Sequence, residues 1–296
     1  MTIGPDQLQA PLERPEWLPQ AEWPFRLRGI TVDGCRLHVI DEGSGPVLLL
    51  VHAGMWSFVW RDLIVDLARN FRCVAIDFPG SGLTRAPAGY PIGLEQNSLL
   101  LEEFVDRLGL TDLTMVAHDL GGVIGLAWAA RHPNLVSGLV LVNTFGWPPQ
   151  PALRGMLALV GSEAMRALDM ATNFLPRLTS GRFGVGRHLS RQARTAFLGP
   201  TRDRARRRTL HQLMRDASRS TRLLERIEIA LRTTLRDRPV LTIFGQHNDP
   251  FRFQQRWSEI FPHARQVVVL HGNHFPMNDD PHGVAVAVRS WWQDRS

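Results

Sequence analysis

Short apolar runs alternate with amphipathic stretches along most of the 296-residue chain. The runs consist mainly of Val, Leu, Ile and Ala, and they lie at residues 47–51, 73–76, 113–116, 139–142, 240–244 and 266–270. Apolar runs of this length, bounded by turn residues, are typical of strands buried on both faces of a parallel sheet. Stretches such as 94–108 and 282–292 have helical periodicity. The alternation predicts an α/β fold, with a mostly parallel twisted sheet and helices on both faces.

Two regions depart from this alternation. Residues 30–40 form two short segments around Asp33 and Gly34, a dipeptide typical of a tight hairpin, which predicts an antiparallel edge of the sheet. Residues 148–238 contain amphipathic helical segments and no convincing strand. The expected division is an irregular, proline-rich N-terminal arm at 1–28, a core at 29–147 and 239–296, and an inserted helical cap (lid) at 148–238.

The composition is that of an ordinary globular protein, with 44% hydrophobic and 21% charged residues. No apolar run approaches the roughly 20 residues of a membrane-spanning helix, and the first 28 residues lack a basic start followed by an apolar signal core. We therefore expect a cytoplasmic protein with no membrane partner. The two cysteines, Cys35 and Cys73, are expected to be reduced, and Cys73 lies in an apolar strand where a small buried thiol is usual.

All 34 basic residues are arginines, and they are unevenly distributed. Residues 148–238 contain 19 arginines against 7 acidic residues, whereas the rest of the chain contains 15 against 21. The arginine-rich run at 202–208 is of a kind that binds nucleic acid or an acidic surface. No nucleic-acid-binding motif accompanies it, so a solvated cap helix is the preferred interpretation and no nucleic-acid partner is expected. The sequence does not determine the oligomeric state, and a homo-oligomer is one possibility.

Residues 113–130 join an apolar strand to a helix through a single turn residue, Asp119. Ala117 and Gly121 flank it two positions away, which is the spacing of a strand–turn–helix elbow that exposes a nucleophile. A carboxylate is already ionised at neutral pH, so it can displace a leaving group from an sp3 carbon and form an ester with the enzyme. The alternative is that Asp119 only caps the following helix, because Asp is a preferred N-cap residue.

Polar residues follow the last two predicted strands, where parallel α/β folds place their sites. His274 would be the general base that activates water to hydrolyse the ester, with His271, closer to the strand end, as the alternative. Asp249 is predicted to orient His274 and to stabilise its imidazolium, in the order nucleophile, acid, base. Counted from Gly245, however, Asn248 holds the usual acid position, so Asp249 requires a one-residue insertion.

Main-chain N–H groups are expected to complete the site. Those of Leu120 and of Ala53 or Gly54 would stabilise the charge that develops on the ester intermediate. The 11 histidines include no His-Glu-x-x-His motif and two cysteines cannot form a thiolate site, so no metal is expected. The loop at 80–82 lacks the third glycine and the lysine of phosphate-binding loops. We expect no cofactor, with a small-molecule substrate and water as partners.

These motifs resemble the Asp-nucleophile branch of the α/β-hydrolase superfamily, which contains haloalkane dehalogenases and epoxide hydrolases. The resemblance extends from about Phe25 to Trp292 and is weakest in the cap. It rests on the turn His52-Ala53-Gly54, the loop from Asp77 to Leu83, the elbow from His118 to Gly122, and the segment from His274 to Pro281. It implies an α/β-hydrolase fold with a helical cap, a catalytic triad, and hydrolysis of a small apolar substrate through an ester on Asp119.

Two departures from the family patterns bear on the leaving group. Dehalogenases of this branch usually have Trp after the nucleophile and Asn after the His-Gly pair, and both donate hydrogen bonds to the halide. Here Leu120 and Gly54 hold these places, and neither side chain can donate. The candidate pocket residues that could supply an indole N–H instead are Trp56, Trp60 and Trp147.

Epoxide hydrolases of the branch use cap tyrosines to protonate the opening ring, and the only tyrosine here, Tyr90, lies outside the predicted cap. Haloalkane dehalogenase-like cleavage of a carbon–halogen bond is therefore the first expectation. The alternatives are an epoxide hydrolase with another proton donor, a related ester or lactone hydrolase, and a binding protein or basic adaptor on a hydrolase fold.

Overall fold

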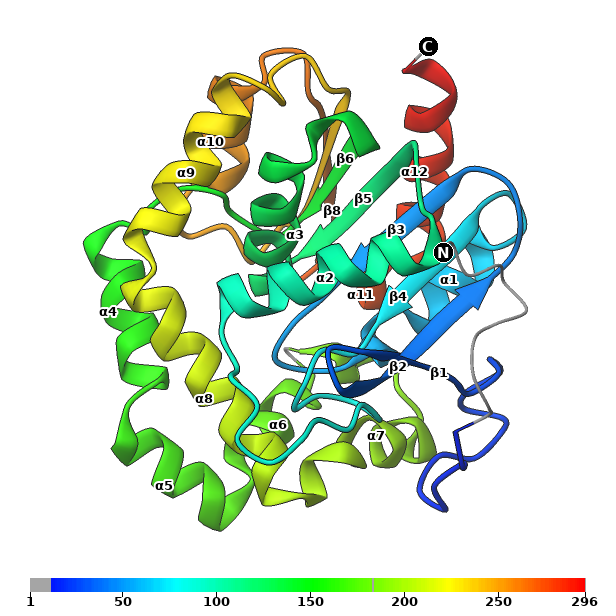
Figure 1. The fold of residues 1–296 in the computed structure, drawn as a ribbon, viewed down its shortest axis with the longest axis vertical. Coiled ribbons are helices and arrows are strands. Elements are labelled where there is room, and N and C mark those ends of the chain that lie inside the picture. Colours follow the sequence, from blue (N-terminus) through cyan, green and yellow to red (C-terminus); the bar gives the residue numbers. More distant parts are fainter. Residues whose placement is uncertain (1–11, 183, 296) are drawn as a thin grey trace.

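The computed structural model of the protein describes residues 12–182 and 184–295. Its centre is an eight-stranded sheet with the order β1-β2-β4-β3-β5-β6-β7-β8 (Figure 1). The strands are β1 (Arg28–Val32), β2 (Cys35–Glu42), β3 (Val47–Val51), β4 (Arg72–Ile76), β5 (Leu113–His118), β6 (Val136–Val142), β7 (Val240–Gly245) and β8 (Arg265–Val269). Neighbours from β4 to β8 are parallel, and β2 pairs antiparallel with both β1 and β4. The predicted, mostly parallel α/β sheet is confirmed.

The antiparallel edge comes from the predicted hairpin. Asp33 (φ 46°) and Gly34 (φ 72°) both adopt left-handed conformations, as the two central residues of the favoured hairpin turn must. The turn places Val32 opposite Cys35. Cys35 and Cys73 are both buried free thiols, and burial raises the pKa of Cys73 to about 12. These cysteines therefore pack as small apolar side chains.

Helices cover both faces of the sheet (Figure 1). One face carries α2 (Leu94–Leu108), α3 (Leu120–Arg131), α9 (Thr221–Arg232) and α10 (Phe253–Ile260), and the other carries α1 (Arg61–Leu67), α11 (Pro276–Asp279) and α12 (Pro281–Asp294). Within the described residues, no helix has both the length and the apolar character needed to cross a membrane.

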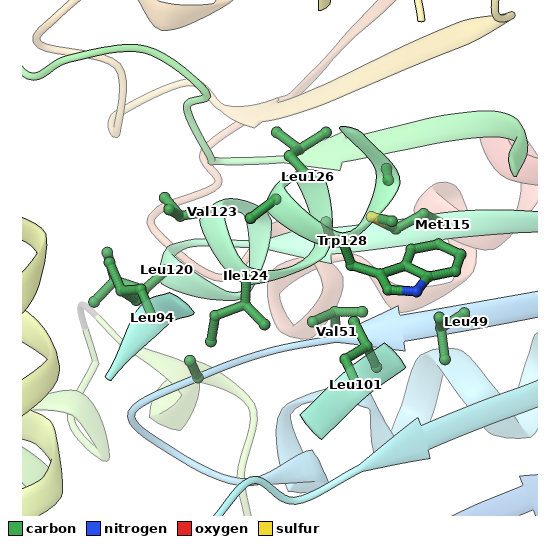
Figure 2. Packing of buried hydrophobic residues seen from close by; sticks show 14 of the residues in the cluster. Leu49, Val51, Leu94, Leu101, Met115, Leu120, Val123, Ile124, Leu126 and Trp128 are labelled. Atoms are coloured by element: carbon green, nitrogen blue, oxygen red, sulfur yellow. The ribbon is translucent and has the colours of Figure 1, made fainter. Parts of the chain in front are cut away.

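Side chains of the central strands alternate between two hydrophobic cores. On β3, Leu49 and Val51 belong to the core under α2 and α3, whereas Leu48 and Leu50 belong to the core under α1 and α12. Figure 2 shows Leu49 and Val51 close to Trp128 of α3. Since a strand turns successive side chains to opposite faces, a run without polar residues requires helices on both sides.

The cap follows β6 and lies near the carboxyl end of the sheet (Figure 1). It consists of α4 (Pro151–Val160), α5 (Glu163–Thr172), α6 (Phe174–Thr179), α7 (Arg191–Leu198) and α8 (Arg204–Arg219), joined by short 3-10 turns. The long helix α8 packs against α4 and α5, whereas α9 packs on α3 through Ile227 and Leu231 in the core cluster. Helix α9 is thus part of the core layer, although its periodicity resembles that of the cap helices.

The described part of the N-terminal arm is anchored by aromatic packing. Trp23 is fully buried and stacks on Trp56, with ring centroids 5.1 Å apart. The guanidinium of Arg14 donates to the carbonyls of Trp23 and Phe25. The arm is irregular in backbone, but its side chains belong to the core under α1.

Candidate active site

Asp119 occupies a strained turn between β5 and α3. Its backbone has φ 51° and ψ −133°, a conformation that is costly for a residue with a side chain. A Cβ on Gly121 would lie 2.5 Å from the Val51 carbonyl oxygen, and one on Gly122 would lie 1.8 Å from Thr144 Oγ1. The Thr144 hydroxyl in turn donates to the Asp119 carbonyl at 2.7 Å. The glycines are therefore needed for the helix to start this close to the neighbouring strands.

His274 faces Asp119 from the loop that follows β8. Its Nε2 lies 3.8 Å from Asp119 Oδ2, which is within the range of an ion pair. Burial alone would raise the pKa of Asp119, but the charge of His274 and the backbone N–H of Leu120 outweigh burial and lower this pKa. Asp119 is consequently held as the carboxylate.

The neighbour of His274 Nδ1 is Asn248, whose Nδ2 lies 3.1 Å away. The structure therefore contradicts the expectation that Asp249 contacts this histidine. Asp249 turns toward α10 instead, and its two carboxylate oxygens accept from the backbone N–H groups of Phe253 and Gln254, at 2.6 and 3.0 Å. Asp249 satisfies the first N–H groups of a helix, a role that Asp commonly fills, so the one-residue insertion assumed for Asp249 is not needed.

Asn143, which is not among the predicted site residues, holds the loop that carries His274. Its Nδ2 donates to the carbonyls of Asn273 and His274 at 2.9 and 2.8 Å, and its Oδ1 accepts from the Gly245 N–H at 3.2 Å. Asn143 also has a left-handed backbone, with φ 38°. An amide at the carboxyl end of a central strand is the signal that indicates such a role.

Two further histidines lie buried behind the site. His118 Nε2 is 2.7 Å from the His274 carbonyl, and His118 Nδ1 is 3.0 Å from His52 Nδ1. A carbonyl only accepts, so Nε2 of His118 carries the proton, its Nδ1 accepts, and His52 Nδ1 donates. Burial, and then the charge of His274, lower the pKa of His52 to about 3 and that of His118 well below its usual value. Both rings are therefore neutral. His118 holds the main chain of His274 through its hydrogen bond, and His52 holds His118.

Of the predicted main-chain donors, Leu120 directly follows Asp119. The backbone N–H of Leu120 helps to lower the pKa of the Asp119 carboxyl. The turn at Ala53 and Gly54 follows Val51, whose carbonyl abuts the first turn of α3, and Gly54 has φ 86°. The Leu120 side chain points into the core, where it is 1% exposed and lies near Leu94 (Figure 2). Only the main chain of Leu120 is thus available to a reacting group.

A cavity of about 250 Å³ opens above Asp119 and His274. Its lining is mostly apolar and combines side chains from the sheet edge and the cap: Asn143, Phe145, Leu153, Met156, Leu157, Val160, Met214, Asn248, Pro250, Phe251 and Phe253. Cavities of this size and polarity hold small organic molecules. The cap provides the aliphatic part of this wall through α4 and α8.

The three tryptophans proposed to serve the leaving group are packed elsewhere. The Trp56 indole donates to the Phe197 carbonyl at 2.9 Å. Trp60 is 1% exposed and lies edge-on to the His52 and His118 rings. Trp147 is also 1% exposed and packs against Trp257, with centroids 4.7 Å apart. These indoles stabilise the core and the arm, which corrects the prediction that they line the pocket.

The loop from Asp77 to Leu83 has a structural role beside the site. Asp77 is buried and accepts from His38 Nδ1 at 2.8 Å and from the N–H groups of Ser57 and Leu83 at 2.7 and 3.2 Å. It therefore ties the hairpin to the segment before α1. Tyr90, the only tyrosine, donates to Asp33 on the hairpin, so its hydroxyl is engaged outside the cap.

Comparison with known proteins agrees with this geometry. Residues 46–281 match the family model described as alpha/beta hydrolase fold. The chain is 32% identical over 272 residues to "Haloalkane dehalogenase 2" of Mycobacterium tuberculosis, covering 90% of this chain and 94% of that protein. It is 29% identical over 275 residues to a cis-3-alkyl-4-alkyloxetan-2-one decarboxylase of Shewanella oneidensis, covering 86% and 85%.

Solved structures show the same fold. The crystal structure of a loop variant of the haloalkane dehalogenase DbeA from Bradyrhizobium elkanii superposes with a TM-score of 0.77 at 22% identity, covering 90% of this chain and 95% of that one. A putative ancestral haloalkane dehalogenase superposes with the same TM-score at 23% identity, covering 90% and 99%. The match to the family model and the 32% identity to a dehalogenase together identify the chain as a hydrolase of the α/β-hydrolase superfamily, in its haloalkane dehalogenase-like branch.

Proposed function

We propose that the enzyme hydrolyses a small apolar substrate through an ester on Asp119. The observation that carries this proposal is the pair of Asp119 and His274, 3.8 Å apart at the inner end of a mostly apolar cavity of about 250 Å³. A carboxylate with a lowered pKa attacks carbon without the help of a base. His274, which faces Asp119, is placed to activate water afterwards.

In the first step, a carboxylate oxygen of Asp119 attacks the substrate carbon and the leaving group departs with the bonding electrons. In the second, His274 Nε2 takes a proton from water, and the resulting hydroxide attacks the ester carbonyl, whose oxygen is near the Leu120 N–H. Nε2 can accept this proton only if Nδ1 carries the other one. Rotating the Asn248 amide so that Oδ1 faces Nδ1 satisfies this requirement.

Asn248 orients His274 but carries no negative charge. It cannot stabilise the imidazolium as a carboxylate does, so hydrolysis of the ester is expected to be the slower step. The same feature distinguishes the two halves of the reaction: attack by Asp119 does not depend on Asn248, whereas release of the product does.

Carbon–halogen cleavage is the first candidate for the attacking step. It is supported by the similarity to the mycobacterial dehalogenase and by the small apolar cavity. The side chains at Leu120 and Gly54 offer no donor to a halide, so bromide and iodide, which are the better leaving groups, should react faster than chloride.

Opening of a four-membered lactone is the second candidate. The lack of side-chain donors at Leu120 and Gly54 favours this candidate, because ring strain promotes opening of the ring without a donor. The leaving carboxylate stays attached to the substrate. The similarity to oxetan-2-one decarboxylases points the same way. Epoxide opening is less favoured, since Tyr90 donates to Asp33 and lies outside the cap.

A product panel with the purified enzyme tests the proposal. Brominated and chlorinated alkanes should yield halide and alcohol if the first candidate holds, and cis-dialkyloxetanones should yield the β-hydroxy acid if the second holds. Diols from epoxides would support the less favoured alternative. A single turnover in H2(18)O should then place the label in the Asp119 carboxylate and not in the first molecule of product. Label found in the product alone would show direct attack of water and would refute the ester.

A further inference from the structure

The outer side of the cap carries a concentration of exposed apolar side chains. Of the eleven large hydrophobic residues that are exposed in the described part of the chain, five lie within residues 156–178: Met156, Leu159, Leu168, Phe174 and Leu178. Their exposed fractions range from 42% to 61%. Single exposed hydrophobic residues are common on soluble proteins, whereas a group of them in one part of the surface indicates an interaction site.

These side chains belong to a face that continues along three consecutive helices. The exposed apolar positions of α4 and α5 recur at helical spacing, so they form one stripe on each helix. Together with two residues of α6 they make up the apolar cap face: Ala152, Gly155, Met156, Leu159, Ala164, Ala167, Leu168, Ala171, Phe174 and Leu178.

The apolar cap face is directed away from the rest of the molecule. Helix α8 packs against α4 and α5 on their opposite side, where Leu153, Leu157 and Asp169 are buried. In Figure 1, α4 and α5 lie at the outer edge of the cap, with α8 between them and the core. The face is therefore available to a partner.

The helices that form and support this face are strongly basic. Helices α4, α5, α6 and α8 contain nine arginines and three carboxylates. Each carboxylate already has a partner: Glu163 pairs with Arg215, Asp169 with His211, and Asp216 with the N–H of Leu94. Five exposed arginines of these helices have no carboxylate within ion-pair distance among the described residues: Arg154, Arg177, Arg204, Arg208 and Arg219.

The charge and the apolar side chains together identify the chemistry of the partner. A second copy of this chain would place two sets of unpaired arginines against each other. A nucleic acid would neutralise the arginines but would leave the apolar side chains in water. An anionic phospholipid bilayer matches both features, because guanidinium groups bind phosphate oxygens and apolar side chains enter the boundary between head groups and acyl chains.

We propose that the apolar cap face binds peripherally to the surface of an anionic phospholipid bilayer. In this arrangement Leu159, Leu168 and Phe174 insert below the head groups, and Arg154 and Arg177 contact the phosphates. The expectation of no membrane partner rested on the lack of a spanning segment, and peripheral binding requires none. The chain outside residues 148–238, with 15 arginines against 21 acidic residues, faces away from the bilayer.

The apolar cap face adjoins the catalytic cavity. Met156 belongs to the face and also lines the cavity, while Leu153 and Leu157 line the cavity from the buried side of α4. A substrate dissolved in the bilayer therefore reaches α4 without passing through bulk water. This consequence rests on the proposed apolar substrate, whereas the binding itself does not.

The test is co-sedimentation of the full-length protein with lipid vesicles, measured without substrate so that the outcome is independent of the reaction. Vesicles of phosphatidylglycerol and phosphatidylcholine in equal parts should bind the protein, and phosphatidylcholine alone or high salt should weaken binding. Leu159→Ser should lower the partition coefficient roughly tenfold through lost apolar burial. Arg154→Gln and Arg177→Gln should each lower it roughly fivefold through lost attraction to the lipid phosphates.

Two variants outside the cap serve as matched controls. Ile229 on α9 is 63% exposed, against 61% for Leu159, and Arg69 is an exposed arginine that follows α1. Ile229→Ser and Arg69→Gln should each change the partition coefficient by less than about twofold, because neither side chain lies on the apolar cap face and salt screens distant charges.

Three outcomes would overturn the proposal. The first is a protein that does not sediment with the anionic vesicles at low salt. The second is equal weakening by Arg69→Gln and Arg154→Gln, which would indicate attraction of any positive charge. The third is unchanged vesicle binding by Leu159→Ser. If that variant also dissociated a dimer in analytical ultracentrifugation, the face would belong to a second copy of the chain.

Discussion

The sheet edge and the cap form opposite walls of one cavity, but they hold their side chains in different ways. At the sheet edge, the Asp119 carbonyl accepts from Thr144, and the His274 carbonyl accepts from both Asn143 and His118. The cap wall offers apolar side chains such as Met156, which is 48% exposed. From this comparison we expect that the core determines the chemistry and that the cap determines which substrates enter.

The largest expected effect comes from breaking the support of the base. Asn143→Ala removes both donors to the loop of His274 and places a less tolerant residue at φ 38°. Stopped-flow measurement of turnover should show a loss of about 100-fold, the scale expected when a catalytic group is misplaced by about 1 Å. Unfolding in urea should show a loss of about 1–3 kcal/mol.

The matched control is Asn173→Ala in the cap. Asn173 is also left-handed, at φ 54°, and donates to Thr201 at 3.1 Å. It should lower stability by a similar amount while turnover stays within about twofold, since its hydrogen bonds do not reach the base. Equal losses of turnover in both variants would contradict the division between core and cap.

The two buried histidines behind Asp119 predict a pH dependence of stability. The folded pKa values of His52 and His118 lie below the ordinary histidine value of about 6.5, so the unfolded chain binds more protons as the pH falls. Stability is therefore fully present above about pH 6.5 and is lost below it, by up to about 1.4 kcal/mol per pH unit for each histidine. Denaturation curves from pH 5 to 8 measure this slope.

In these denaturation curves, His52→Phe should reduce the slope of the unfolding free energy against pH. The expected reduction is that of one bound proton, about 1.4 kcal/mol per pH unit. The variant keeps an aromatic ring beside Trp60 and removes a ring nitrogen, His52 Nε2, that is buried without a partner among the described residues. An unchanged slope would mean that His52 is not a buried neutral group.

A smaller effect is expected from exchanging the partner of His274. Asn248→Asp places a carboxylate 3.1 Å from Nδ1 and should accelerate hydrolysis of the ester by roughly tenfold, because it stabilises the imidazolium. Asp249→Asn should leave turnover unchanged and cost about 1 kcal/mol of stability through the weakened start of α10. If Asp249→Asn lowered turnover more than Asn248→Ala did, Asp249 and not Asn248 would be the residue that orients His274.

The smallest effect belongs to the cap wall. Met214→Ala enlarges the cavity from α8 and should change KM by a few-fold in favour of longer chains, with kcat for a short substrate nearly constant. A KM series over alkyl chain lengths measures this shift. A large fall in kcat for every chain length would show that the cap takes part in the chemistry.

The fold could be predicted from sequence because its signals are local. The run at 47–51 coincides with β3, the periodic stretch at 94–108 coincides with α2, and Asp-Gly at 33–34 marks the hairpin. The elbow at Asp119 was equally local, because small neighbours and an abrupt change from strand to helix are both visible in a few residues.

The remainder of the site depends on distant parts of the chain. Whether Asn248 or Asp249 reaches His274 is decided by where α10 begins, and the bonds of Asn143 span about 130 residues. Trp147 follows a strand as a site residue would, yet it packs against Trp257 of a later helix. Helical periodicity likewise could not separate α9 from the cap, since both kinds of helix bury one face.

The central claim is that Asp119 forms an ester that His274 then hydrolyses, and one measurement tests it directly. His274→Gln keeps the nucleophile and removes the base, so incubation with a brominated alkane should increase the intact mass of the protein by one alkyl group. Peptide mapping should locate this group on Asp119, and the double variant with Asp119→Ala should gain no mass. An adduct on another residue, or unmodified His274→Gln with a substrate that the wild type turns over, would contradict the account.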